Sequence, residues 1–367
     1  MVVKCDVLVV GAGPAGLTAA ALLSKNGYST IVLENKKTGG PQHTSYDITE
    51  GTRIKKILKK IEVKPLKISS KSEWFSPNYQ YMLKSTIEDY YFKRGPDKDS
   101  LEKSLMKKIQ GNNVEFFFRS NISSFRLKGK KVVTVTVDSP HETFTFKPRY
   151  IIGADGPTSD LRKKLNVETK MLATFRGFGV LVETKKKEMI PHAKIYFDKK
   201  LAPGGYIYSG SVGKDTFYCT VIDDVFFKKT NLAKNLDYFL ENRLRKKFTI
   251  KNKFNGIGIS GIQNSKIGNI LFIGGAALFY DPFFGYGLNY AIESAYIAVN
   301  AINTDDLQIY TEYTKRIQKE LKDIFVSREI WRKADNMFFD KLIEAFKGNY
   351  NTKDKQINRI LTLFAED

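Results

Sequence analysis

Cysteine and histidine are scarce, which limits the cross-links and metal sites that the chain can form. The 367 residues include two cysteines, Cys5 and Cys219, and three histidines, His43, His141 and His192. Two cysteines give neither a disulfide framework nor the C-x-x-C spacing of a zinc site, so we expect a reducing compartment. The histidines are too dispersed in the sequence for a recognisable metal pattern, and no metal site is expected.

Long apolar runs are absent as well. No stretch of the sequence reaches the roughly 18 apolar residues that a membrane-spanning helix requires. From Met1 the chain runs directly into an apolar segment that the fold needs. These features predict a soluble cytoplasmic protein that is at most peripheral, at the inner face of a membrane.

Acidic residues are outnumbered by basic ones. The sequence has 39 Asp and Glu against 60 Lys and Arg, which gives a formal net charge of +21. Such a surface favours an anionic partner, and an anionic membrane is one, because each basic residue near acidic headgroups adds about 1 kcal/mol. A lysine-rich surface that only keeps the protein soluble is the alternative interpretation. No motif of a nucleic-acid-binding fold accompanies the charge, so no nucleic-acid partner is expected.

The first 34 residues have the pattern of a strand, a helix and a second strand. In order they are the apolar run Cys5–Val10, the glycine-rich segment Gly11–Gly16, the helical segment Leu17–Lys25, the strand Ser29–Leu33 and the acidic residue Glu34. A G-x-G-x-x-G segment between a strand and a helix, with an acid about 20 residues further on, predicts a Rossmann-type dinucleotide site.

Each glycine of this segment has a physical role. Gly11 permits a tight turn, Gly13 lets the backbone approach a pyrophosphate, and Gly16 lets the helix pack on the sheet. The N-terminus of the helix then presents free N–H groups to the phosphates, and the acid accepts hydrogen bonds from the ribose. The further contacts expected here are Pro14, Ala15, Glu34 and Asn35.

Two later segments resemble the p-hydroxybenzoate hydroxylase superfamily of flavoproteins. Tyr150–Ser159 contains the Gly-Ala-Asp-Gly sequence that ends a strand beside the cofactor in that superfamily. Leu271–Asn289 resembles its second FAD fingerprint, although Gly275 replaces the aspartate that bonds the ribityl chain. The resemblance implies FAD as cofactor, held in part by Asp155, Gly156, Gly274, Gly275, Gly285, Gly287, Leu288 and Asn289. A lost ribityl hydrogen bond would weaken FAD binding by about 0.5–1.5 kcal/mol.

Within this superfamily the chain resembles the geranylgeranyl reductases. Gly40-Pro41 matches their loop near the flavin, whereas their loop cysteine is absent and Thr44 is its nearest counterpart. Tyr206 and Tyr208 fit the aromatic positions of their substrate-domain motif. Arg94 occupies the place of an arginine that approaches the cofactor, and an arginine suits a phosphate because it binds bidentately.

The resemblance implies reduction of carbon–carbon double bonds in a long isoprenoid lipid. An external electron donor is then required, either NAD(P)H or a ferredoxin-like protein. The residue that protonates the substrate is not defined by any motif, and the candidates are His43, Tyr206 and Tyr208. The alternatives are an FAD-dependent aromatic hydroxylase of the same superfamily and a flavoprotein without turnover, which Gly275 and the missing cysteine would suit.

The expected fold is α/β, with a Rossmann-type FAD-binding domain, an antiparallel-sheet substrate domain and C-terminal helices. Alternating apolar runs at 122–127, 132–137 and 144–146 predict an antiparallel meander. On a strand, Tyr206, Tyr208 and Gly210 would form an aromatic wall with a gap at the glycine. The expected boundaries are 1–65, 90–165 and 263–305 for the FAD domain, 66–89 and 166–262 for the substrate domain, and 306–367 for the helical region.

Overall fold

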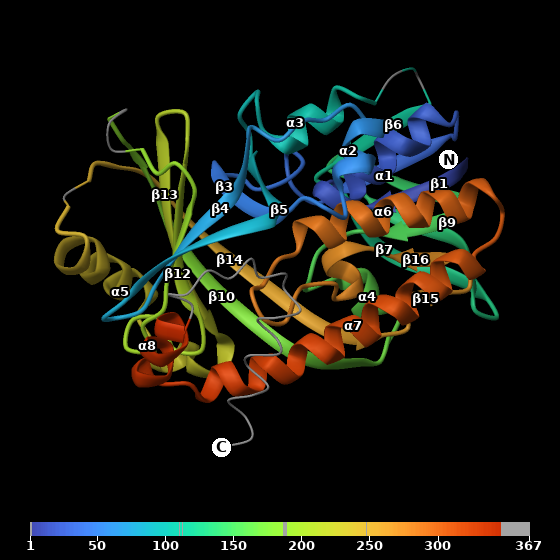
Figure 1. Cartoon of the computed structure of the whole chain (residues 1–367). Helices are drawn as coiled ribbons and strands as arrows, with labels where there is room; N and C mark the ends of the chain where they lie inside the picture. The colour runs from blue at the N-terminus through green and yellow to red at the C-terminus, as the bar shows by residue number, and fades with distance from the viewer. Residues whose placement is uncertain (1, 110, 112, 186–188, 247, 346–367) are drawn as a thin grey trace.

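Two eight-stranded sheets organise the molecule, one on each side in Figure 1. The computed structural model describes residues 2–109, 111, 113–185, 189–246 and 248–345. The first sheet has the order β15-β16-β9-β1-β2-β6, and β7 and β8 extend it from β9. Its strands are β1 (Val2–Val10), β2 (Thr30–Glu34), β6 (Val114–Phe118), β7 (Asn121–Lys128), β8 (Lys131–Asp138), β9 (Thr143–Gly153), β15 (Lys266–Ile267) and β16 (Ile270–Phe272).

The centre of the first sheet is parallel and buried on both faces. β1 pairs in parallel with β2 and β9, β2 pairs with β6, and β9 pairs with β16. Val7, Leu8 and Val9 are each 0% exposed, which explains why β1 is continuously apolar instead of alternating. β7, β8 and β9 are antiparallel neighbours, so the predicted Rossmann unit and the predicted meander are both confirmed.

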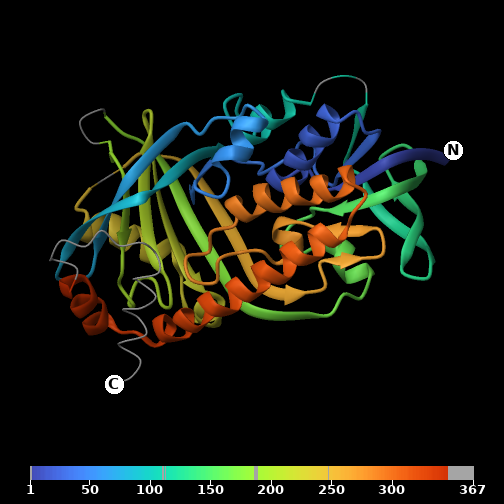
Figure 2. The same ribbon diagram turned by 45° about the vertical axis from the view of Figure 1, so that its right-hand side comes forward.

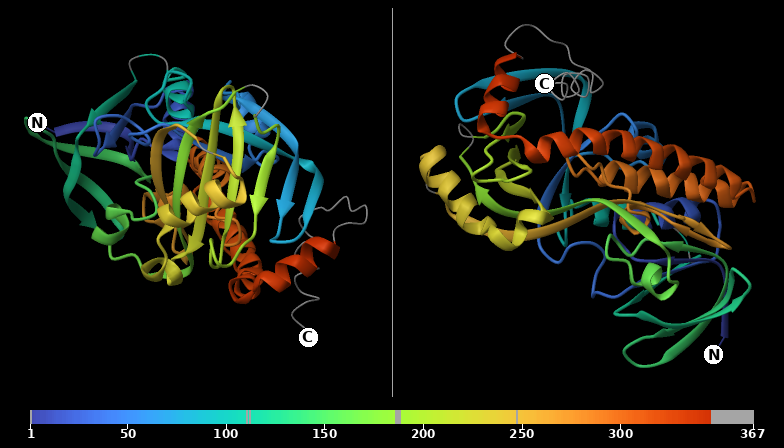
Figure 3. Two further views of the ribbon diagram at one scale, coloured as in Figure 1. Left: turned by 90° about the vertical axis from the view of Figure 1, so that its left-hand side faces the viewer. Right: turned by 90° about the horizontal axis from the view of Figure 1, so that it is seen from below.

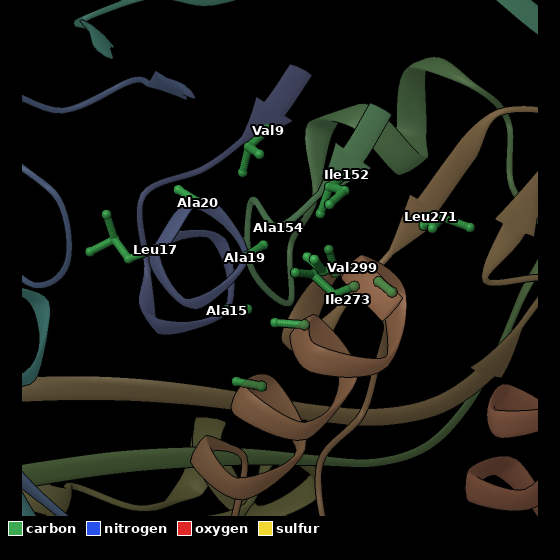
Figure 4. Packing of buried hydrophobic residues seen from close by; sticks show 14 of the residues in the cluster. Val9, Ala15, Leu17, Ala19, Ala20, Ile152, Ala154, Leu271, Ile273 and Val299 are labelled. Atoms are coloured by element: carbon green, nitrogen blue, oxygen red, sulfur yellow. The ribbon is translucent and has the colours of Figure 1, made fainter. Parts of the chain in front are cut away.

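Small residues let the first helix, α1 (Pro14–Lys25), lie close to this sheet. Ala15 and Ala19 are buried between β1, β9 and the later helix α6 (Leu288–Asn303), as Figure 4 shows. A Cβ atom on Gly16 would lie 3.3 Å from the Ala154 Cβ atom, so a larger residue would push the helix away. This close packing holds the N-terminus of α1 at the carboxyl end of β1.

The second sheet has the order β14-β10-β13-β12-β11-β4-β5-β3. Its neighbours are antiparallel except β4 and β11, which run parallel. The strands are β3 (Ser45–Glu50), β4 (Lys67–Phe75), β5 (Gln80–Arg94), β10 (Thr169–Glu183), β11 (Ala193–Tyr196), β12 (Tyr206–Val212), β13 (Asp215–Asp223) and β14 (Ile250–Gln263). The predicted two-domain α/β fold with a largely antiparallel second sheet is thereby confirmed.

The strands at 45–50 and 90–94 differ from the expected boundaries, which placed them with the first domain. β3 and the end of β5 pair with each other in the second sheet. The ring of Tyr46 stacks on Phe217 of β13 with 5.4 Å between the ring centroids. This contact joins segments far apart in the chain, and such a contact leaves no local signal in the sequence.

Helices connect and flank the two sheets. α6 and α7 (Gln308–Lys333) lie side by side (Figure 2), and α7 continues beneath both sheets to α8 (Asn336–Ala345), as Figure 3 shows from below. Trp331 of α7 and Phe339 of α8 pack against Phe197, which fixes the C-terminal helices to the second sheet. The shorter elements are α2 (Lys55–Lys60), α3 (Leu101–Met106), α4 (Asp160–Lys164), η2 (Asp224–Lys229), α5 (Leu232–Tyr238), η3 (Phe239–Arg243) and η4 (Gly274–Ala277).

The predicted C-terminal helical region is present as α7 and α8, whereas residues 346–367 of that prediction lie outside the described residues. On α7, Tyr310, Ile317 and Leu321 are each 0% exposed, so they form the buried face of this helix. Within the described ranges, no helix combines the length and the apolar character needed to cross a membrane.

Candidate functional site

A cavity of about 1620 Å³ runs between the two sheets. Its walls include the loop after β1, the end of β2, the turn after β9, the start of α6, and strands of the second sheet. Ligand pockets commonly measure about 300–1,000 Å³, so this space exceeds what one small ligand needs.

The glycines after β1 shape one end of the cavity. Gly11 has φ +107°, and a Cβ atom there would lie 2.4 Å from the Ala154 carbonyl oxygen. A Cβ atom on Gly16 would lie 1.9 Å from the Gly11 oxygen, whereas one on Gly13 would meet no atom within 4 Å. Gly11 and Gly16 are thus required by the protein's own packing, and Gly13 leaves open space where the pyrophosphate is expected.

Glu34 is fixed at the end of β2. Its Oε2 atom accepts a hydrogen bond from the Ala12 N–H at 2.8 Å, and its Oε1 atom accepts one from the Lys36 N–H at 3.0 Å. Glu34 as a whole residue is 8% exposed, and both Glu34 and Asn35 line the cavity. The carboxylate is therefore held in place at the cavity wall. Each of its oxygen atoms has a second lone pair, so it can still accept a hydrogen bond from a ribose hydroxyl.

Asp155 brings an unsatisfied acceptor to the cavity. Its Oδ2 atom accepts from the Leu161 N–H at 3.0 Å, while its buried Oδ1 atom has no hydrogen-bond partner among the described residues. Burial raises the pKa of this carboxyl. A buried polar atom without a partner in the protein is a site where a bound ligand can donate.

Gly275 lies beside this turn, in η4. It lines the cavity, and its φ is outside the left-handed region, but a Cβ atom there would lie 3.0 Å from both N and Cδ of Pro157. The neighbouring Gly274 has φ +52° and donates its N–H to the Ser294 hydroxyl at 2.9 Å. Gly274 and Gly16 therefore support the wall from behind, since neither lines the cavity itself.

The N-terminus of α6 opens into the cavity. Asp281 holds the preceding loop by accepting from the Phe283 and Phe284 N–H groups at 2.8 and 2.6 Å. Gly285 has φ +71°, and a Cβ atom on Gly287 would lie 2.4 Å from the Tyr280 ring. The predicted contacts that line the cavity here are Gly285, Gly287, Leu288 and Asn289. Because the first residues of this 16-residue helix line the cavity, the positive end of its dipole can stabilise negative charge there.

Arg94 lines the cavity but is committed to protein partners. Its Nε atom donates to Glu102 at 2.6 Å, and its Nη1 atom forms an ion pair with Asp47. The sequence predicts that the guanidinium binds the cofactor, but it does not indicate the ion pairs with these two carboxylates. The guanidinium retains N–H donors beyond these two bonds, so it can still add positive charge to the wall.

The second sheet supplies an aromatic wall. Tyr206 and Tyr208 of β12 both line the cavity, with their ring centroids 6.0 Å apart. The Tyr206 hydroxyl donates to the Phe284 carbonyl oxygen, which joins this wall to the loop before α6. The expected gap at Gly210 is wrong, because the rings of Phe217 and Tyr91 lie 2.8 and 3.0 Å from where its Cβ atom would be.

His43 is placed away from this site. It is exposed, and it does not line the cavity, whereas Gly40 and Pro41 from the same loop do. Titratable residues that the sequence did not single out line the cavity instead, among them Asp47, Cys219 and Tyr280. Their positions depend on strand pairing in the second sheet and on the turn before Asp281. A local sequence motif could therefore not have predicted that they line the cavity.

The geometry fits a dinucleotide cofactor. The open space above Gly13, the carboxylate of Glu34 and the unsatisfied oxygen of Asp155 border one continuous cavity. FAD needs a pyrophosphate contact, a ribose contact and a helix N-terminus near the flavin, and the chain offers each of them.

Known proteins give matching results. A model of the family described as FAD binding domain matches residues 4–63 and 91–304. The digeranylgeranylglycerophospholipid reductase of Methanocaldococcus jannaschii is 26% identical over 390 residues, covering 97% of this chain and 95% of that protein. Digeranylgeranylglycerophospholipid reductase 3 of Methanosphaera stadtmanae is 24% identical over 379 residues, covering 95% of this chain and 92% of that protein.

Solved structures share the fold. A geranylgeranyl bacteriochlorophyll reductase-like protein from Thermoplasma acidophilum superposes with a TM-score of 0.81 at 19% identity, covering 96% of this chain and 94% of that one. The p-nitrophenol 4-monooxygenase of Pseudomonas putida gives 0.74 at 15% identity, covering 99% and 98%. At these identities the structures show a common architecture, which serves both reductases and monooxygenases.

Proposed function

The chain belongs to the FAD binding domain family, and from this premise we propose that it saturates carbon–carbon double bonds in the isoprenoid chains of a lipid. FAD is its cofactor, and it is an FAD-dependent oxidoreductase. The names of the relatives favour an isoprenoid lipid substrate, because the two reductases above are similar to this chain along almost its whole length.

The proposal rests on one observation: a single cavity connects the expected cofactor site with the second sheet. From the loop at Gly13 it extends to a wall that includes Trp74, Ile195, Tyr206 and Phe254. This wall is aromatic and aliphatic, as a hydrocarbon chain requires, and the volume of about 1620 Å³ leaves room for a long substrate beside the cofactor. A hydroxylase acting on a small polar ring would favour a compact polar pocket instead.

The residues of this chain would bind and orient, while FAD, when bound, supplies the hydride chemistry. We assign the pyrophosphate to the loop at Gly11 and Gly13, with Pro14 and Ala15 at the start of α1. We assign the adenosine ribose to Glu34 and Asn35. The α6 N-terminus, at Gly287 to Asn289, would stabilise negative charge on a reduced flavin. Asp155, Gly156 and Gly275 would border the ribityl chain, and Arg94 would add positive charge nearby.

Two partners complete the proposal. Because the enzyme must be reduced again after each turnover, it needs an external electron donor, either NAD(P)H or a ferredoxin-like protein. A membrane lipid also has to be reached at its bilayer, and the net charge of +21 would attract the protein to anionic headgroups at the cytoplasmic face. We therefore propose peripheral contact with an anionic membrane.

Product analysis tests this function. The FAD-loaded protein is incubated with a lipid that carries geranylgeranyl chains and with dithionite as the reductant. The molecular mass of the extracted lipid is then measured by mass spectrometry. We expect the lipid to gain one pair of hydrogens for each double bond reduced. An unchanged lipid, together with hydroxylation of an aromatic acid in air, would instead support the monooxygenase alternative.

A further inference from the structure

Tyr208 and Cys219 form a polar pair in the aromatic wall of the cavity. They are register partners on the antiparallel strands β12 and β13, so their side chains lie on one face of the sheet. Both line the cavity, and Cys219 is 3% exposed. Tyr208 packs against the buried cluster that includes Cys219. The wall thus carries a thiol and a phenol side by side, among residues that are otherwise mainly apolar.

The neighbouring strand leaves room for this thiol. Gly179 of β10 is the register partner of Cys219 on its other side. A Cβ atom on Gly179 would lie 2.7 Å from the Cys219 Sγ atom and 2.4 Å from the Phe254 ring. A glycine in the interior of a strand weakens it, and one common reason for its presence is close approach by another group. Here that approach comes from the sulfur and from an aromatic residue of the cavity wall.

Both members of the pair keep their protons at neutral pH. Burial raises the pKa of the Cys219 thiol to about 12 and raises the pKa of the Tyr208 phenol well above its ordinary value. Asp47 is the nearby acid that adds to both effects, and it is itself ion-paired with Arg94. Tyr206, on the same strand, also faces the pair, and burial raises its pKa as well.

Three other titratable residues of the cavity are less suited to give up a proton there. The Tyr206 hydroxyl is engaged by the Phe284 carbonyl oxygen, and the Asp47 carboxylate by Arg94. Tyr280 packs against Gly258 and Gly287, at the loop before α6 and not within the aromatic wall of β12 and β13. The thiol of Cys219, beside the phenol of Tyr208, is therefore a proton-bearing group in the wall where the hydrocarbon chain would pass.

We propose that the Tyr208–Cys219 pair supplies the proton that completes alkene reduction in this cavity, an inference that rests on the proposed function. FAD, when bound and reduced, would supply the hydride that forms a C–H bond at one alkene carbon, and it would be oxidised in doing so. The S–H bond of Cys219 breaks as its proton forms a C–H bond with the other carbon. The thiolate takes the Tyr208 O–H proton, and solvent water protonates the phenolate. Cys219 is then a catalytic residue, and Tyr208 is a positioning residue that returns its proton.

Single-turnover kinetics of paired variants test the proposal. Reduced, FAD-loaded protein is mixed without oxygen with a geranylgeranyl-chain lipid, and flavin reoxidation is followed in H₂O and D₂O. Cys219→Ala should slow this step by about 100-fold or more, the usual contribution of a general acid, with FAD content unchanged. Tyr208→Phe should slow it less. Cys219→Ser should recover part of the rate, since a hydroxyl also carries a proton.

The chain offers a matched control for each variant. Cys5 is the other cysteine, buried on β1 of the first sheet, and Cys5→Ala should react within about two-fold of the unmodified protein. Tyr91 is a buried tyrosine of β5 that does not line the cavity, and Tyr91→Phe should behave likewise. Because the thiol pKa is about 12, the rate in the unmodified protein should show no thiol titration between about pH 6 and 9.

The S–H stretching band in the infrared spectrum gives a readout that is independent of turnover. In the Cys5→Ala background Cys219 supplies the thiol band, and the isoprenoid lipid should shift this band by entering the cavity beside the thiol. If Cys219→Ala and Tyr208→Phe reoxidise at the normal rate, with an unchanged solvent isotope effect, the proton role is wrong while the reductase function stands. If the unmodified protein does not reoxidise with the lipid at all, the proposed function itself is overturned. Equal losses in the Ala and Ser variants, without any change in the isotope effect, would assign Cys219 to packing alone and overturn the proposal.

Discussion

Gly13 has free space around it, so the packing of the protein itself does not require a glycine there. A Cβ atom there would touch no protein atom within 4 Å, because the position faces the cavity. Gly13→Val should therefore leave the fold intact and occupy the space of the pyrophosphate. We expect a protein with normal thermal stability in the absence of cofactor and with FAD affinity lowered at least about ten-fold, which corresponds to about 1.4 kcal/mol. FAD titration followed by flavin fluorescence checks this, and normal FAD occupancy would contradict it.

The place of Gly275 in the fingerprint suggests that an aspartate there would strengthen FAD binding, whereas the packing around Gly275 leads us to expect that it would not. Restoring aspartate would supply the missing ribityl acceptor, but its Cβ atom would lie 3.0 Å from N and Cδ of Pro157. Gly275→Asp alone should cost about 1–3 kcal/mol of unfolding free energy through overpacking and should not tighten FAD. Adding Pro157→Ala removes the Cδ contact, so the double variant should be more stable than the single one and should bind FAD more tightly. Chemical denaturation and FAD titration measure both effects. A stable single variant with tighter FAD would show that the turn moves freely.

The residues that a local motif could reveal are those whose role depends on local backbone geometry. Gly11 must have positive φ and Gly16 must pack against it, so their spacing could be predicted from the sequence. Cys219 reaches the cavity only through the pairing of β10, β12 and β13, and alternation along a strand buried on both faces does not distinguish it. The gap expected at Gly210 failed for the same reason, because Phe217 fills it from the neighbouring strand.

At the scale of elements, a buried ion pair joins α7 to the second sheet. The Arg328 side chain is 0% exposed, its Nη2 atom lies 3.0 Å from Asp223 Oδ2, and its guanidinium lies 4.6 Å from the centre of the Phe175 ring. Its Nε and Nη1 atoms have no partner among the described residues. Asp223→Asn should therefore cost about 3–5 kcal/mol of unfolding free energy, because it leaves a buried charge unpaired.

Comparison with an exposed pair makes this prediction specific. The side chains of Asp160 and Lys163 are 74% and 66% exposed, so Asp160→Asn should cost less than about 1 kcal/mol. The double variant Asp223→Asn/Arg328→Met should lose much less than the sum of its two single variants, since it removes both charges together. Urea denaturation of the five proteins measures these differences. Additive losses would mean that the pair does not couple α7 to β13.

Most elements could be predicted from the sequence, whereas several of their partners could not. The unit of β1, α1 and β2 follows from a local apolar pattern, and so does the meander of β7 to β9. The pairing of β3 with β5 and the parallel pairing of β4 with β11 depend on contacts between distant segments, such as the stacking of Tyr46 on Phe217. The domain boundaries near residues 45 and 94 therefore required the structure.

At the scale of the whole molecule, the net charge of +21 predicts binding to membranes that depends on salt. The Debye length falls from about 8 Å at physiological ionic strength to about 3 Å in molar salt, so electrostatic attraction to acidic headgroups should be largely lost across that range. Sedimentation with anionic and neutral vesicles over a salt series tests this. We expect binding to anionic vesicles at low salt and release at high salt. Equal partition to both vesicles, or none to either, would leave the charge as a determinant of solubility.

The central claim is that a reduced FAD enzyme delivers its electrons to an isoprenoid double bond. The most direct measurement is the flavin absorbance after the reduced protein is mixed, without oxygen, with a geranylgeranyl-chain lipid. The account predicts that the absorbance of oxidised flavin returns at a rate that rises with lipid concentration, and that a fully saturated lipid has no effect. A flavin that stays reduced with the unsaturated lipid, and is oxidised only when oxygen is admitted together with an aromatic substrate, would contradict it.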